Sequence, residues 1–129
     1  MKQNRFSARD RISSFRNALN GLRNVIQGEP NSWIQMAVAL CVIIAGVLFK
    51  ITTCEWVSMA FAIGLVISLE IINTSIEKLA DFISQEKQES IKKIKDISAA
   101  GVLTGAITAL AIGLIIFLPK IFKLLALGN

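Results

Sequence analysis

Three long apolar stretches, separated by short polar segments, dominate the sequence. The residues from Trp33 to Phe49, from Trp56 to Leu69 and from Ile97 to Pro119 carry no charge. A helix needs about 20 mostly apolar residues to cross a bilayer. We therefore predict an all-α integral membrane protein, a single domain over residues 1–129, with transmembrane helices at about 32–50, 56–80 and 96–119.

A different pattern precedes the first stretch. Apolar residues recur there at steps of three and four, at Ile12, Phe15, Leu19, Leu22 and Ile26. This spacing predicts an amphipathic helix over about 8–28, ended by Gly28, that lies on the membrane surface. The alternative is an ordinary helix whose apolar face contacts other protein. Phe15, Arg16 and Arg23 are candidate lipid contacts. Phe15 belongs to the apolar face, and arginine is well suited to hold phosphate groups.

Composition and charge agree with a membrane protein. The chain is 53% hydrophobic and 18% charged, with a net charge of +5. Six of its fourteen Lys and Arg residues precede Gly28, and five lie between Lys78 and Lys95. Basic segments favour the cytoplasmic side, so we place the N-terminus and residues 78–96 in the cytoplasm and the C-terminus outside. We expect residues 84–95 to form a solvated loop or a helical turn.

The second apolar stretch leads directly into a row of polar side chains. At helical spacing, Glu70, Asn73, Glu77 and Asp81 fall on one stripe. A carboxylate near the bilayer centre costs about 3 kcal/mol on insertion scales, so the stripe should face water, a metal or a ligand. The chain has no histidine, and its two cysteines have no metal-binding spacing. Metal binding would then use carboxylates and favour a hard ion such as Mg²⁺.

Further polar residues belong to the same predicted cytoplasmic side. Glu29 precedes the first span, and Lys95 and Asp96 precede the third. Carboxylates can hold Mg²⁺, a lysine can hold phosphate oxygens, and another carboxylate can accept a proton from an attacking hydroxyl. These are the groups that phosphoryl transfer requires. Neither a Walker A motif nor a protein-kinase glycine loop is present.

The polar motifs resemble those of a known family. The segment Glu-Ile-Ile-Asn-Thr-Ser-Ile-Glu at 70–77, with Asp81 and the later Lys95-Asp96-x-x-Ala99-Ala100, resembles the signature of the small bacterial membrane lipid kinases. This is the diacylglycerol kinase and undecaprenol kinase family. Gly21-Leu22-Arg23 and Glu29 extend the resemblance towards the N-terminus.

The resemblance implies an activity and an assembly. The protein would transfer the γ-phosphate of ATP, with Mg²⁺, to the hydroxyl of a membrane lipid, giving undecaprenyl phosphate or phosphatidic acid. It would be a homotrimer in the cell membrane, with sites shared between subunits. Glu70 would be the general base, and Glu29 and Glu77 would bind Mg²⁺. The nucleotide-binding residues would be Asn17, Glu29, Asn73, Glu77, Glu86, Lys87, Gln88, Lys95 and Asp96.

Two features bear on the branch of the family. The Gram-negative diacylglycerol kinases usually carry an aromatic nucleotide contact in the surface helix, where this chain has Asn17 and no tyrosine anywhere. The segments Glu29-Pro30-Asn31 and 113–122 resemble the undecaprenol kinase branch. The resemblance therefore favours undecaprenol over diacylglycerol.

Two other functions compete with the kinase. A small transporter or proton-coupled membrane component would also use an intramembrane acid, but this explains Glu70 alone. A structural subunit whose acids pair with Lys78 and Lys95 is a third reading. For the kinase, we expect the lipid hydroxyl to enter sideways from the cytoplasmic leaflet, so that no enclosed pocket is required.

Overall fold

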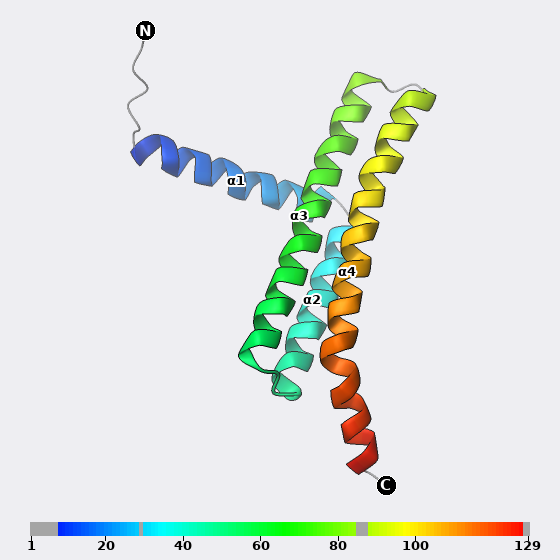
Figure 1. The fold of residues 1–129 in the computed structure, drawn as a ribbon. Helices are drawn as coiled ribbons and strands as arrows, with labels where there is room; N and C mark the ends of the chain where they lie inside the picture. The colour runs from blue at the N-terminus through cyan, green and yellow to red at the C-terminus, as the bar shows by residue number, and fades with distance from the viewer. Residues whose placement is uncertain (1–7, 29, 85–87, 128–129) are drawn as a thin grey trace.

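The computed structural model describes residues 8–28, 30–84 and 88–127. Within these ranges the chain forms four α-helices (Figure 1), namely α1 Ala8–Gly28, α2 Pro30–Leu48, α3 Thr53–Ile83 and α4 Glu89–Leu127. Three of the described helices, α2, α3 and α4, are long and apolar enough to cross a membrane. The predicted all-α architecture with three candidate spans is confirmed.

Helix α1 runs across the direction of the other helices and is attached at its C-terminal end (Figure 1). There the buried Ser32 hydroxyl donates a hydrogen bond to the backbone carbonyl of Val25, at 3.4 Å. The Nζ atom of Lys78 lies 3.8 Å from the position that a Cβ on Gly28 would take. A cation at this position interacts favourably with the C-terminal end of a helix dipole. By contrast, the apolar face of α1, including Phe15, is exposed within the described chain.

Helices α2 and α3 are joined by a tight turn. Lys50 has a positive φ of 49°, and Thr52 caps α3. The Thr52 hydroxyl accepts a hydrogen bond from the backbone N–H of Glu55 at 3.3 Å. In return, the backbone N–H of Thr52 donates a hydrogen bond to the Glu55 carboxylate at 2.7 Å. This reciprocal capping box satisfies two backbone groups that a helix start would otherwise leave unpaired. It allows α3 to begin a few residues before the expected position 56.

The most extensive packing is between α3 and α4. A core of Ile51, Met59 and Ile116 lies near the α2–α3 turn. The rings of Phe49 and Phe117 pack edge to face beside it, with 6.0 Å between their centroids. Next to this core, Lys120 on α4 forms an ion pair with Glu55 on α3, with 2.6 Å between the Lys120 Nζ and Glu55 Oε1 atoms.

Glycine allows a second close approach between α3 and α4. A Cβ on Gly105 would collide with the side chain of Leu69, whereas Gly101 has no neighbour within 4 Å of that position. Of these two glycines, which lie four residues apart on α4, only Gly105 therefore serves close packing among the described residues.

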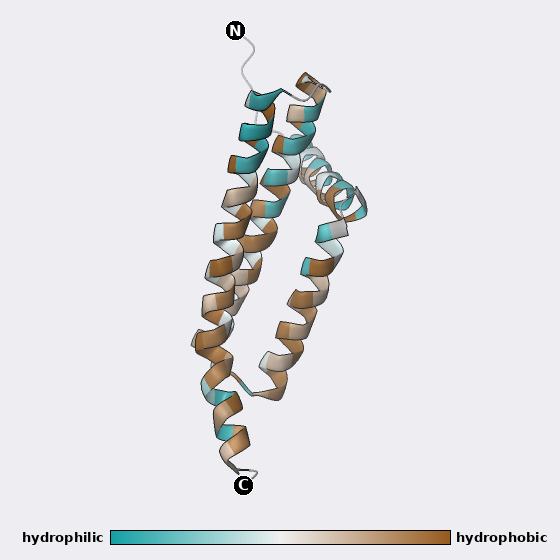
Figure 2. Cartoon of the chain, turned by 90° about the vertical axis from the view of Figure 1, so that its right-hand side faces the viewer, coloured by the Kyte–Doolittle hydropathy of each residue, from teal (hydrophilic) through white to brown (hydrophobic). Residues whose placement is uncertain are grey.

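Helices α3 and α4 extend beyond their predicted bounds. α3 continues to Ile83, and α4 begins at Glu89, so most of the described part of the expected loop is helical. Glu89, Lys92 and Lys93 are good helix formers, and they place opposite charges three and four positions apart. At 39 residues, α4 is about 58 Å long and exceeds the roughly 30 Å of a bilayer core. Figure 2 shows polar residues on the projecting ends of α3 and α4.

Candidate active site

The polar stripe of α3 is buried where it leaves the apolar half of the helix. Glu70, Asn73 and Thr74 are only 7%, 8% and 2% exposed. Glu77 is half-buried and Asp81 is exposed, so burial decreases towards the end of the helix. Buried polar side chains in such apolar surroundings are costly unless they bind a partner. The gradient therefore indicates a site that opens towards the end of α3.

Asn73 and Glu77 form the most specific contact in this stripe. The Asn73 amide donates to the Glu77 carboxylate at 3.1 Å. The Oδ1 atom of Asn73 is buried and has no hydrogen-bond partner among the described residues. Leaving such an acceptor unpaired costs about 1–3 kcal/mol. A bound cation or a donor group of a ligand would satisfy it.

These oxygens fit the requirements of Mg²⁺. The ion prefers oxygen ligands and is usually held by one or two carboxylates together with substrate phosphates, rather than by a complete protein cage. Glu77 and the unpaired oxygen of Asn73 provide such donors from neighbouring turns of α3. The described residues contain no cluster of three acidic, histidine or cysteine side chains that could hold a metal alone. The donor set suits a metal that arrives with a phosphate ligand.

Lys95 and Asp81 connect the ends of α3 and α4. The Nζ atom of Lys95 lies 2.9 Å from the Asp81 carboxylate. Lys95 is half-buried, and the neighbouring Asp96 is exposed on α4. The ion pair with Lys95 therefore gives the charge of Asp81 a partner within the chain. It does not account for the buried Glu70, whose side chain makes no hydrogen bond or ion pair with another described residue.

The remaining predicted site residues are spread over several elements. Gln88 is exposed just before α4, and Phe15, Arg16, Asn17 and Arg23 are exposed on α1. Asn17 precedes Gly28 by eleven residues, or about 16 Å along α1. The predicted residues Glu29, Glu86 and Lys87 lie outside the described residues.

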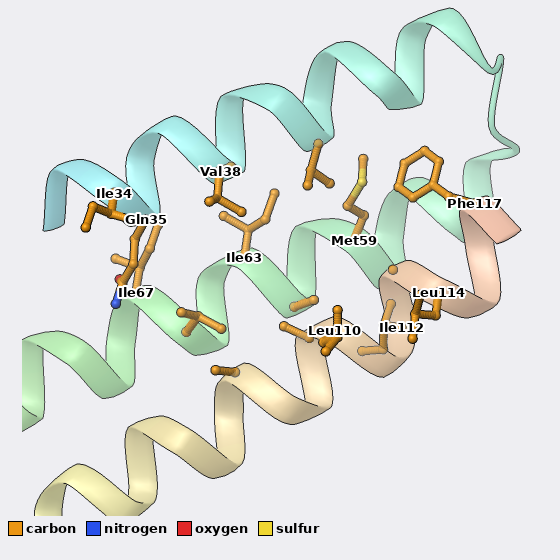
Figure 3. A pocket seen from close by; sticks show the side chains of 17 residues that line it. Ile34, Gln35, Val38, Met59, Ile63, Ile67, Leu110, Ile112, Leu114 and Phe117 are labelled. Carbon is orange, nitrogen blue, oxygen red and sulfur yellow. The ribbon is translucent and has the colours of Figure 1, made fainter. Parts of the chain in front are cut away.

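Two features of this region were missed by the sequence reasoning. Thr74 is the most buried residue of the stripe, and its position four residues after Glu70, on the same face of the helix, was the available signal. The second feature is an apolar cavity between α2, α3 and α4 (Figure 3). Small residues on all three helices leave this space, among them Ala39, Ala62 and Ala109.

Comparison with known proteins identifies the family. Residues 16–117 match the family described as prokaryotic diacylglycerol kinase, which includes the α3 stripe and Lys95. The chain belongs to this family. It is 36% identical over 110 residues to the undecaprenol kinase of Bacillus subtilis (strain 168), covering 85% of this chain and 89% of the relative. It is 30% identical over 115 residues to a diacylglycerol kinase of Synechocystis, covering 88% of this chain and 66% of the relative.

Family membership places the chain among the lipid kinases. Together with the three apolar helices, it makes the protein a multi-pass membrane enzyme of the transferase class. The resemblance seen in the sequence is thereby confirmed. The transporter and structural-subunit readings have no support from these relatives.

Proposed function

We propose that the protein transfers the γ-phosphate of ATP to the hydroxyl of undecaprenol, in an Mg²⁺-dependent reaction that yields undecaprenyl phosphate. The observation that carries this proposal is the burial of Glu70 on the same helix as the Asn73–Glu77 pair. The undecaprenol kinase relative is the more similar of the two described above, and its match covers more of the relative. Diacylglycerol, which would give phosphatidic acid, is the alternative acceptor.

Glu70 is the general base in this proposal. It lies at the boundary between the apolar half of α3 and its polar end, where a lipid hydroxyl can approach while its tail stays in the membrane. A carboxylate within hydrogen-bond reach of the hydroxyl can accept its proton as the oxygen attacks the phosphate. Glu77 lies seven residues further on, about 10 Å along the helix. This separation suits one carboxylate beside the lipid hydroxyl that accepts the phosphate and another beside the ATP that donates it.

Glu77 and Glu29 hold Mg²⁺ in this proposal, with the Asn73 oxygen as a further ligand or hydrogen-bond acceptor. The ion would neutralise charge on the transferred phosphate. The nucleotide would be held by Asn17, Glu86, Lys87, Gln88, Lys95 and Asp96. Lys95 is suited to bind phosphate oxygens, because its ammonium group is a compact charge on a flexible side chain. Its ion pair with Asp81 is partly exposed, so this charge is within reach of a nucleotide.

The proposed assembly is a homotrimer in the cell membrane, with the N-terminus and residues 78–96 in the cytoplasm and the C-terminus outside. The exposed apolar face of α1 suits the membrane surface. Asn17 lies eleven residues before Gly28, the attached end of α1, so the polar stripe of a neighbouring subunit is a suitable partner for it. In this arrangement α1 of one subunit covers the site of the next.

Phosphate transfer from radiolabelled ATP to a panel of lipids tests the proposal. Undecaprenol, diacylglycerol and ceramide would be offered separately in mixed micelles, with and without Mg²⁺. We expect Mg²⁺-dependent labelling, greatest for undecaprenol. Preferred labelling of diacylglycerol would reassign the acceptor, and no labelling of any lipid alcohol would refute the proposed function.

A further inference from the structure

Thr74 on α3 carries a hydroxyl group that is buried without a partner in the described part of the chain. The residue is only 2% exposed, less than Glu70 or Asn73 on the same helix. Its hydroxyl makes no hydrogen bond with another described residue. By contrast, the hydroxyl of Ser75, the next residue, donates to the backbone carbonyl of Ile71 at 2.8 Å. A buried hydroxyl without a hydrogen bond is costly, so Thr74 indicates a group that comes from outside the described chain.

Glu70 lies one helical turn before Thr74 and is in the same situation. It is 7% exposed, and its side chain also makes no hydrogen bond with a described residue. Residues four positions apart share one face of a helix, and a helical side chain leans towards the preceding turn. The hydroxyl of Thr74 therefore lies on the side of its helix that carries Glu70. Two neighbouring polar groups, both buried and both unpaired, suit a single ligand that reaches the two of them.

The position of Thr74 along α3 indicates which part of the ligand it would meet. Thr74 follows Glu70 by about 6 Å along the helix axis and precedes Glu77 by about 4.5 Å. In the proposed reaction, Glu70 lies beside the lipid hydroxyl and Glu77 lies beside the phosphates of ATP. The phosphate group that passes from one to the other must lie between them. Thr74 is therefore at the level of the transferred group.

The chemistry of the neighbouring side chains leaves a role for a hydrogen-bond donor. Phosphate oxygens accept hydrogen bonds, whereas the ionised carboxylates of Glu70 and Glu77 can only accept them. The amide nitrogen of Asn73 already donates to Glu77 at 3.1 Å. A threonine hydroxyl can donate, and that of Thr74 has no other partner among the described residues. Its natural partner is an oxygen of the transferred phosphate.

We propose that the Thr74 hydroxyl donates a hydrogen bond to a non-bridging oxygen of the phosphate group in transfer. This inference rests on the proposed function and adds a catalytic residue to it. Transfer forms the bond from the lipid oxygen to the γ-phosphorus and breaks the bond from that phosphorus to the β–γ bridging oxygen. The proton of the lipid hydroxyl passes to Glu70, and Thr74 keeps its own proton. A donor fixed on a helix stabilises charge on the transferred group without having to be ordered first.

Binding of a mimic of the transferred phosphate tests the inference without relying on activity. The probe is MgADP with aluminium fluoride, titrated calorimetrically into the full-length protein in lipid nanodiscs. Thr74→Val keeps the shape of the side chain and removes the hydroxyl, whereas Thr74→Ser keeps the hydroxyl. Ser75→Ala is the matched control, because it removes an adjacent, exposed hydroxyl that already bonds within its own helix.

We expect the fluoride complex to bind about ten-fold more weakly to Thr74→Val. Thr74→Ser and Ser75→Ala should bind it like the wild type, and MgADP alone should bind equally to all four proteins. Unchanged binding of the fluoride complex in Thr74→Val would overturn the inference. So would a wild-type protein whose affinity for MgADP does not respond to fluoride.

Thermal unfolding separates contact with the ligand from a role in packing. Because the Thr74 hydroxyl has no partner to lose within the described chain, Thr74→Val should not lower the unfolding midpoint. A lowered midpoint, together with weak fluoride binding that Thr74→Ser does not restore, would show a packing role and contradict the inference. Thr74→Cys, which replaces the hydroxyl by a weak donor, takes the place of Thr74→Val if the latter fails to fold.

Kinetics distinguish this inference from the proposed function. In Thr74→Val, kcat for the lipid alcohol should fall about ten-fold or more, while KM for ATP and for the lipid stay nearly unchanged. A change in KM alone would contradict a contact with the phosphate in transfer. If the wild-type protein phosphorylates no lipid alcohol, the proposed function fails, and the fluoride titration still decides whether Thr74 binds a phosphate-like group. Normal turnover in Thr74→Val beside an active wild type would refute the role of Thr74 alone.

Discussion

Asn73 holds Glu77 through its amide nitrogen and keeps its carbonyl oxygen buried without a partner among the described residues. The first contact fixes the carboxylate one helical turn away. The buried carbonyl oxygen is a hydrogen-bond acceptor that only a further group can satisfy. Such an arrangement costs stability in the absence of a ligand and recovers it when a ligand binds. This arrangement supports the proposed role of the pair in ligand binding.

Glu77→Gln should weaken the apparent affinities for Mg²⁺ and ATP. The amide keeps the size of the side chain and can still accept a hydrogen bond from Asn73, but it lacks the charge that a divalent cation requires. Glu29→Gln should produce the same defect if both carboxylates hold the metal. Initial rates measured across Mg²⁺ and ATP concentrations would separate the two requirements. A loss of turnover with both requirements unchanged would argue against metal binding.

Glu70→Gln should lower turnover by about two or more orders of magnitude while ATP binding survives. Loss of a general base removes proton transfer from the reaction but leaves the nucleotide contacts in place. Turnover would be measured with lipid in excess, and ATP binding by equilibrium dialysis. Near-normal turnover in a correctly folded variant would exclude Glu70 from this role.

Gly46→Ala should destabilise the protein without changing the affinity for ATP. A Cβ on Gly46 would lie 3.0–3.1 Å from side-chain atoms of Met59, Trp56 and Ile51, so the core near the α2–α3 turn would have to move. Overpacking of this kind typically costs about 1–3 kcal/mol. Gly64→Ala is the control, because its Cβ would meet no atom within 4 Å. The midpoints of thermal unfolding in detergent should differ, and equal midpoints would contradict the close packing at Gly46.

The fold and part of the site were predictable because their signals are local. Uninterrupted apolar runs determine the spans, and the spacing of Glu70, Asn73 and Glu77 places them on one helix without knowledge of the packing. The ends of α3 and α4 were harder to place, because a mixed-charge segment has the same composition in a solvated helix as in a loop. The observed helix beyond Glu89 therefore corrects the loop prediction in part.

Other features depend on how separate helices meet. The pairing of Lys95 with Asp81 requires the register between α3 and α4, which no single segment encodes. The cavity arises from small residues on three helices, and its volume is a property of their packing. The contacts proposed between Asn17 and another subunit depend on an assembly that a single chain does not specify.

The last prediction concerns α1, whose apolar residues Ile12, Phe15, Leu19 and Leu22 are exposed within the described chain. Phe15 is 68% exposed and belongs to the same apolar face as Ile12 and Leu19. If α1 lies on the membrane and covers the reacting head group, it should help to bring lipid to the site and exclude water. Phe15→Asp should then raise the lipid concentration needed for half-maximal rate several-fold and leave the ATP requirement nearly unchanged. Ser14→Asp is a control for added charge, because Ser14 is also exposed on α1 but does not belong to the apolar face. Normal lipid dependence in Phe15→Asp, with the protein folded and membrane-inserted, would reduce α1 to an anchor without a part in substrate access.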